Sequence, residues 1–89
     1  MSGKDSTSEI IKLIENYLDS DNSDVELPFI SQFMNENYFD AEKIREKFYI
    51  LVEMYDSVKL RKILDLIEYL TLYSPVKLVE IISSEKFTE

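Results

Sequence analysis

The chain of 89 residues contains no histidine and no cysteine. Neutral imidazole and thiolate are the usual general bases, nucleophiles and transition-metal ligands in proteins. Their absence excludes His-based and Cys-based triads, ordinary zinc sites and thiol redox chemistry. We therefore expect no catalytic, cofactor-binding or metal-binding residues, and we interpret the protein as non-enzymatic.

Glycine is almost absent as well, occurring once at Gly3. A phosphate-cradling loop of the glycine-rich kind is therefore excluded. The segment that starts at Asp19 has the acidic spacing of a calcium loop, but that motif requires glycine at its sixth position and glutamate at its twelfth. Asp24 and Ile30 occupy those positions, so we interpret the segment as a polar turn.

Acidic residues number 18, so pairs at helical spacing arise by chance. The best placed pair for acid–base chemistry is Asp65 with Glu68, on the most apolar stretch of the chain. Catalysis by two carboxyl groups needs a cleft in which apolar surroundings raise one pKa. A chain this short offers little room for such a cleft, and we interpret both residues as part of a solvated helix face.

Long apolar runs are also missing. The longest, from Phe48 to Val52, has five residues, whereas a helix that spans a bilayer needs about 20. Residues 1–9 lack the apolar stretch of a secretory signal. We therefore expect no membrane interaction and an intracellular protein, cytoplasmic or nuclear.

The size of the chain favours one domain. At 10.5 kDa, it can bury roughly 60% of its unfolded surface, which is enough for a single core. We expect a disordered tail over residues 1–6 and a single helical domain over residues 7–89.

The net charge of −8 is unevenly distributed. Residues 1–40 contain two basic and nine acidic side chains, whereas residues 41–89 contain eight basic and nine acidic ones. An acidic field repels phosphate backbones and attracts basic proteins, so nucleic-acid binding is not expected. Alternatively, the acidic surface only keeps the protein soluble.

Apolar residues recur with the helical period, and no segment alternates as a strand does. The sequence predicts an all-α fold, a compact bundle or orthogonal array of about five short helices in a single domain. The first helix covers roughly residues 7–18, with Ser6 and Glu9 as a capping box. The second begins between Asp24 and Pro28. The predicted buried residues of these two helices are Ile10, Leu13, Ile14, Tyr17, Leu18, Phe29, Ile30, Phe33 and Met34.

Asp40 is the expected cap of a third helix that begins at Ala41. Asp56 with Ser57 is the expected cap of a fourth, although one continuous helix from Ala41 to Tyr73 remains open. A fifth is predicted from Pro75 to Glu85. The expected buried residues are Ile44, Phe48, Leu51, Val52 and Tyr55 on the third helix and Val76, Leu78, Val79 and Ile82 on the fifth. The expected solvated residues of the third helix are Glu42, Lys43, Arg45, Glu46 and Lys47.

The third and fourth helices carry more aromatic, leucine and methionine side chains than their predicted buried faces hold. Such side chains are typical of contact surfaces. We expect a partner-binding surface with apolar anchors and an acidic rim. The candidate anchors are Tyr49, Met54, Leu66, Tyr69 and Tyr73, and the candidate rim is Asp19, Asp21, Asp24 and Glu26.

The sequence thus favours a protein–protein interaction module, a small acidic regulator, adaptor or inhibitor whose partner is another protein, with a basic protein as one option. One alternative is a homodimerising assembly domain that uses the same surplus of apolar surface. Another is an acidic inhibitor of a basic nuclease or nucleic-acid-binding protein, by analogy of charge and size with immunity proteins.

Overall fold

The computed structural model describes residues 5–54 and 56–83. Within these residues the chain forms five α-helices and no strand. The predicted all-α fold is confirmed. The helices are α1 (Thr7–Leu18), α2 (Ser23–Glu36), α3 (Ala41–Glu53), α4 (Ser57–Tyr73) and α5 (Pro75–Ile82).

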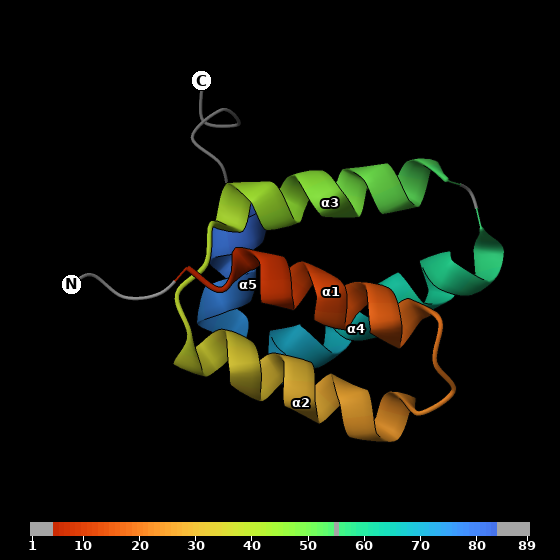
Figure 1. The fold of residues 1–89 in the computed structure, drawn as a ribbon, viewed down its shortest axis with the longest axis horizontal. Coiled ribbons are helices and arrows are strands. Elements are labelled where there is room, and N and C mark those ends of the chain that lie inside the picture. Colours follow the sequence, from red (N-terminus) through yellow and green to blue (C-terminus); the bar gives the residue numbers. More distant parts are fainter. Residues whose placement is uncertain (1–4, 55, 84–89) are drawn as a thin grey trace.

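The helices enclose one core with α1 at its centre. Helices α2 and α3 flank α1 on opposite sides, and α4 crosses behind it (Figure 1). Helix α5 contacts both α3 and α4. Successive helices α1 to α4 run in alternating directions (Figure 1), because short connections return the chain alongside the preceding helix.

Two predicted caps are confirmed, and they separate α3 from α4. The carboxylate of Asp40 accepts hydrogen bonds from the backbone N–H groups of Glu42 and Lys43 at the start of α3. Asp56 does the same for Val58 and Lys59 at the start of α4. Since Asp56 has extended backbone angles, a continuous helix from Ala41 to Tyr73 is not formed.

Ser6 is the N-cap residue of α1, as predicted, but the predicted side-chain cap is not formed. The carboxylate of Asp5 instead accepts hydrogen bonds from the backbone N–H and the hydroxyl of Thr7, and these bonds lower the pKa of Asp5. Helix α2 begins at Ser23, one residue before the predicted range, and holds Pro28 in its interior.

Asp5 and Ser6, which the sequence placed in a disordered tail, are held against the loop between α2 and α3. Asp5 forms an isolated bridge with Tyr38, and the N–H of Ser6 donates to the carbonyl of Tyr38 at 2.8 Å. Ser6 is buried. The rest of the predicted tail, residues 1–4, lies outside the described residues.

The core combines side chains from all five helices and the loop before α3. It consists of Ile10, Ile14, Tyr17, Leu18, Ile30, Met34, Phe39, Ile44, Phe48, Leu51, Ile63, Leu66, Leu70, Leu78 and Ile81. Leu13 and Phe33 are partly buried against it. The predicted face of α1 is therefore confirmed, as are Ile30 and Met34 of α2.

Several side chains predicted to be buried are exposed, namely Phe29, Val52, Val76, Val79 and Ile82. Phe29 and Val52 lie at the edges of the buried arcs of their helices. On α5 the predicted stripe was rotated, because this helix turns Leu78 and Ile81 inward. Helix α5 also ends at Ile82 rather than Glu85, since Ser83 has an extended backbone. Tyr55 and Glu85 lie outside the described residues.

Arg45, predicted to be solvated, is only 8% exposed. It lies next to Ile44 on α3, on the side that α4 and α5 cover. Its guanidinium lies 3.7 Å from the carboxylate of Glu42, so the buried charge has an acidic neighbour.

Candidate functional site

The predicted apolar anchors do not form one surface. Leu66 is fully buried in the core and is not available to a partner, because it lies on the side of α4 that faces the other helices. Tyr49, Met54 and Tyr73 are more than half exposed, and Tyr69 is half-buried. Tyr49, Met54 and Tyr69 each line a different hollow.

The predicted acidic rim is also divided. Asp19 forms an ion pair with Lys59 at 3.5 Å. Asp21 is exposed in the turn between α1 and α2. Glu26 is half-buried, and its Oε1 atom has no hydrogen-bond partner. Asp24 is exposed and lines the same hollow as Tyr69.

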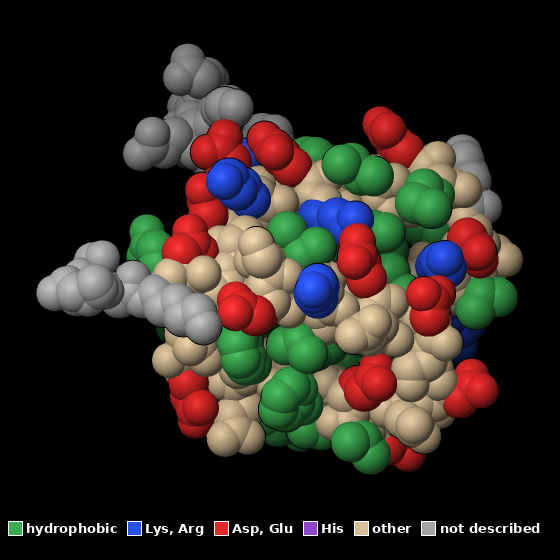
Figure 2. Space-filling view, viewed as in Figure 1, with side chains coloured by type: hydrophobic (Ala, Val, Ile, Leu, Met, Phe, Trp, Pro, Cys, Tyr) green, Lys and Arg blue, Asp and Glu red, His purple; other side chains and the backbone are tan. Residues whose placement is uncertain are grey.

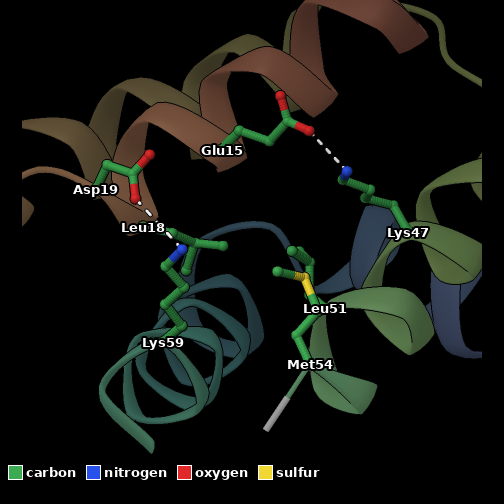
Figure 3. Close-up of a pocket in the computed structure, with 7 residues that line it drawn as sticks. All are labelled: Glu15, Leu18, Asp19, Lys47, Leu51, Met54 and Lys59. Atoms are coloured by element: carbon green, nitrogen blue, oxygen red, sulfur yellow. Dashed lines mark ion pairs between the residues drawn. The ribbon is translucent and has the colours of Figure 1, made fainter. Parts of the chain in front are cut away.

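The hollow at Met54 lies between the end of α1, the end of α3 and the start of α4 (Figure 3). Its volume is about 250 Å³. Two ion pairs cross it, Glu15 with Lys47 at 2.6 Å and Asp19 with Lys59 at 3.5 Å (Figure 3). Its two carboxylates are therefore neutralised by two ammonium groups, and it offers no net charge to a partner.

The hollow at Tyr69 lies between α2 and α4 and has a volume of about 330 Å³. We call it the acidic groove. It is lined by Ser23, Asp24, Leu27, Asp65, Glu68, Tyr69 and Leu72. The four residues from α4 are spaced so that they share one side of the helix, and the three from α2 face them.

The acidic groove has an excess of negative charge. Asp24, Asp65 and Glu68 are exposed, and no lysine or arginine is found among the lining residues that the structure describes. None of these three carboxylates forms an ion pair within the described part of the chain. Their charge is therefore open to a cation from outside.

Apolar side chains accompany these carboxylates. Leu72 is 69% exposed, and Leu27 and Tyr69 are half-buried. The ring of Tyr69 contacts that of Tyr73, with centroids 4.4 Å apart. The groove lining thus combines apolar and acidic side chains. Of the predicted anchors and rim residues, it includes Tyr69 and Asp24.

Asp65 also affects a buried neighbour. The pKa of Tyr17 is raised to about 12, first by burial and then by the negative charge of Asp65. The hydroxyl of Tyr17 donates to the backbone carbonyl of Lys62 at 2.7 Å. At neutral pH Tyr17 is therefore an uncharged structural residue beside the acidic groove.

A further hollow lies between α3, α4 and α5, with a volume of about 210 Å³. We call it the apolar groove. It is lined by Arg45, Phe48, Tyr49, Val52, Ile63, Ile67, Ile81 and Ile82. Among the described residues that line it, Arg45 is the only charged one, so its character is opposite to that of the acidic groove.

The face that carries α1, α2 and α3 has acidic and basic side chains interspersed, with hydrophobic side chains gathered over α2 (Figure 2). Val25 and Phe29 of α2 are 69% and 54% exposed. Mixed charge of this kind is typical of an ordinary soluble surface.

No group of three or more acidic side chains in residues 5–54 and 56–83 has an arrangement that could hold a metal ion. None of the helices in the same part of the chain has the length and apolar character needed to cross a bilayer. Comparison of the chain with protein-family models, curated proteins and solved structures found no match.

Sequence reasoning named Tyr69 and Asp24 but missed most of the acidic groove. Asp65 and Glu68 were noticed and assigned to a solvated face, which is where they lie, but their position opposite α2 depends on helix packing. Leu27 follows Glu26 and Leu72 lies four residues after Glu68, which is the only further sign in the sequence of apolar residues near acidic ones. The pairing of α2 with α4 was not encoded in any local pattern.

Proposed function

We propose that this protein is a non-enzymatic interaction module, an intracellular adaptor, regulator or inhibitor that binds a basic amphipathic segment of another protein in the acidic groove. The observation that carries the proposal is that Asp24, Asp65 and Glu68 line one groove together with partly or largely exposed apolar side chains, with no basic residue among the described residues of the lining. An apolar base contributes affinity, and unpaired charges steer the partner and determine its orientation.

The groove suits a helix with lysine or arginine on the two sides of an apolar stripe. The stripe would contact Leu27, Tyr69 and Leu72, which are already partly or largely exposed. The basic side chains would reach the carboxylate of Asp24 on α2 on one side and those of Asp65 and Glu68 on α4 on the other. Helix-in-groove recognition of this kind uses apolar anchors at helical spacing.

The experiment measures binding of a fluorescent helical peptide made of leucine and lysine, with the leucines in one stripe and the lysines on its two sides. Fluorescence anisotropy is followed at about 0.05 M and about 0.5 M salt, because salt screens interactions between exposed charges. We expect saturable binding that weakens as salt rises. The same peptide with glutamate in place of lysine is expected not to bind.

The double variant Asp65→Asn with Glu68→Gln retains side-chain size and removes two charges. Exposed ion pairs contribute roughly 0.2–1 kcal/mol each, so we expect an affinity loss of about two- to thirtyfold for the pair. The double variant Asp21→Asn with Glu80→Gln removes the same charge outside the groove. An equal loss in both variants would show that net charge, and not the groove, binds the peptide.

Tyr69→Ala tests the apolar part of the same site. We expect weaker binding of the peptide with a cooperative thermal transition retained, since Tyr69 is only half-buried. Loss of the cooperative transition would place Tyr69 in the core and remove it from the proposed site.

A further inference from the structure

A carboxylate and two aromatic rings follow one another along the side of α4 that lines the acidic groove. Asp65 and Tyr69 are four residues apart and both line the groove, so they are neighbours on one side of the helix. Tyr73 is four residues further on, and its ring contacts that of Tyr69 with centroids 4.4 Å apart. Glu68 lines the groove beside them. A cation bound by the carboxylate of Asp65 would therefore lie near the ring of Tyr69.

The rings beside these carboxylates have no cation of the protein's own. Elsewhere, the rings of Tyr17 and Phe39 each have the ammonium group of a lysine over them, at 5.4 Å and 5.3 Å. Within the described residues, no lysine or arginine lies over the ring of Tyr69 or Tyr73. Tyr73 is 58% exposed and Tyr69 is half-buried. Ring and carboxylate are thus both open to a cation of a partner.

A ring next to a carboxylate distinguishes arginine from lysine. The guanidinium group is planar, so it can stack on a ring while the N–H groups in its plane donate to a neighbouring carboxylate. The ammonium group of lysine is a compact and strongly hydrated charge, which is less suited to making both contacts at once. A cation–π contact at an exposed site corresponds to about a two- to fivefold difference in affinity.

We propose that the acidic groove selects arginine over lysine, and that Tyr69 is the residue that determines this preference. The inference rests on the proposed function, because it names the basic side chain that the groove recognises in its partner. In the complex, one guanidinium group of the partner stacks on the ring of Tyr69 and donates to the carboxylate of Asp65 or Glu68. Asp24, on α2, attracts a second basic side chain across the groove.

The test compares two fluorescent helical peptides with the same leucine stripe, one with lysine and the other with arginine on both sides of the stripe. Fluorescence anisotropy with the full chain at about 0.15 M salt gives the two dissociation constants. We expect both peptides to bind, and the arginine peptide to bind about two- to fivefold more tightly, because one guanidinium group stacks on Tyr69.

Variants of Tyr69 separate the ring from the rest of the side chain. Tyr69→Leu keeps an apolar side chain and removes the ring, so the two peptides should bind to it with equal affinity. Tyr69→Phe keeps the ring, so it should retain the preference for arginine. Tyr49→Leu is the control, because it removes a ring that is 52% exposed on α3 and lines the apolar groove instead. Circular dichroism melting checks that each variant is folded.

A second measurement needs no variant. In NMR spectra of the unchanged protein with the arginine peptide, we expect intermolecular nuclear Overhauser effects between an arginine side chain and the ring protons of Tyr69. We also expect upfield shifts of the arginine Cδ protons, because a group stacked on a ring lies in its shielding zone.

Equal affinity of the two peptides for the unchanged protein would overturn this inference and leave the proposed function standing. An arginine preference that persists in Tyr69→Leu would also overturn it, since the carboxylates alone would then select the guanidinium group. So would a bound arginine peptide without NMR contacts to the ring of Tyr69. If neither peptide binds, the proposed function fails, and this inference fails with it.

Discussion

Tyr17 and Lys62 form two hydrogen bonds that run in opposite directions between α1 and α4. The hydroxyl of Tyr17 donates to the backbone carbonyl of Lys62 at 2.7 Å, and the ammonium of Lys62 donates to the backbone carbonyl of Tyr17 at 3.0 Å. The ammonium also donates to the carbonyl of Ser20. Because α1 has no basic residue in its last turn, Lys62 supplies from α4 the positive charge that a helix C-terminus favours.

Ionisation of Tyr17 should lower the free energy of unfolding at alkaline pH. Its folded pKa is raised from 10.0 to about 12, mainly by burial. The unfolded chain therefore loses this proton first, and the stabilisation is complete below pH 10 and lost as pH rises toward 12. A shift of about two units corresponds to about 2–3 kcal/mol. Urea denaturation across this range should show a smaller decline for Tyr17→Phe, and an equal decline would contradict the assignment.

Ser31 and Ser74 should behave as a coupled pair. Both are buried, their hydroxyl groups are hydrogen-bonded to each other, and Ser74 also donates to the carbonyl of Ser31 at 3.2 Å. Either alanine substitution leaves a buried polar group without its partner, at a cost of about 1–3 kcal/mol. The double alanine variant is expected to cost about 0.5–2 kcal/mol less than the sum of the single variants. Strict additivity in urea denaturation would show that the two hydroxyl groups act separately.

Leu66 and Leu72 provide a matched test of burial on one helix. Leu66 is fully buried and Leu72 is 69% exposed. Leu66→Ala is expected to lower the free energy of unfolding by about 2–5 kcal/mol, since it leaves a cavity, whereas Leu72→Ala should change it by about 0.5 kcal/mol or less. Thermal melts of the two variants check this. Similar losses would mean that α4 is rotated relative to the described packing.

The carboxylate of Asp56 is expected to stabilise the start of α4, at the break between α3 and α4. Its carboxylate accepts hydrogen bonds at 3.0 Å and 3.3 Å from the first turn of α4. Asp56→Ala should therefore cost about 1 kcal/mol, within the usual range of about 0.5–2 kcal/mol for an N-cap. Asp21→Ala removes the same charge from an exposed turn and serves as the control. If both variants melt alike, the cap contributes nothing beyond its charge.

Local sequence patterns predicted the helices well where side chain and backbone interact within a few residues. Asp40 and Asp56 cap the helices they were expected to cap, and Pro75 begins α5. The predicted side-chain cap of Ser6 is not formed, because Thr7 and Asp5 form a competing local arrangement. Propensity alone does not choose between two such hydrogen-bonded turns.

Whether a residue at the edge of a helix's buried face is itself buried could not be predicted in the same way. Arg45 and Val52 lie on the same side of α3, yet the charged residue is buried and the apolar one is 44% exposed. The difference depends on how far α4 and α5 extend over α3. Helical periodicity gives the direction of a side chain but not the presence of a neighbour in that direction.

The sequence by itself determined the helical fold, two of the caps, the lack of histidine and cysteine chemistry, and the acidic charge, because these depend on residue type and short-range spacing. The tertiary structure alone decided that Asp24, Asp65 and Glu68 share one groove while Tyr49 and Ile82 share another. Asp24 lies on α2 whereas Asp65 and Glu68 lie on α4, and Tyr49 and Ile82 lie on α3 and α5. They come together because particular helix faces pack against each other. This packing minimises the exposed apolar surface of the whole chain and not of any one segment.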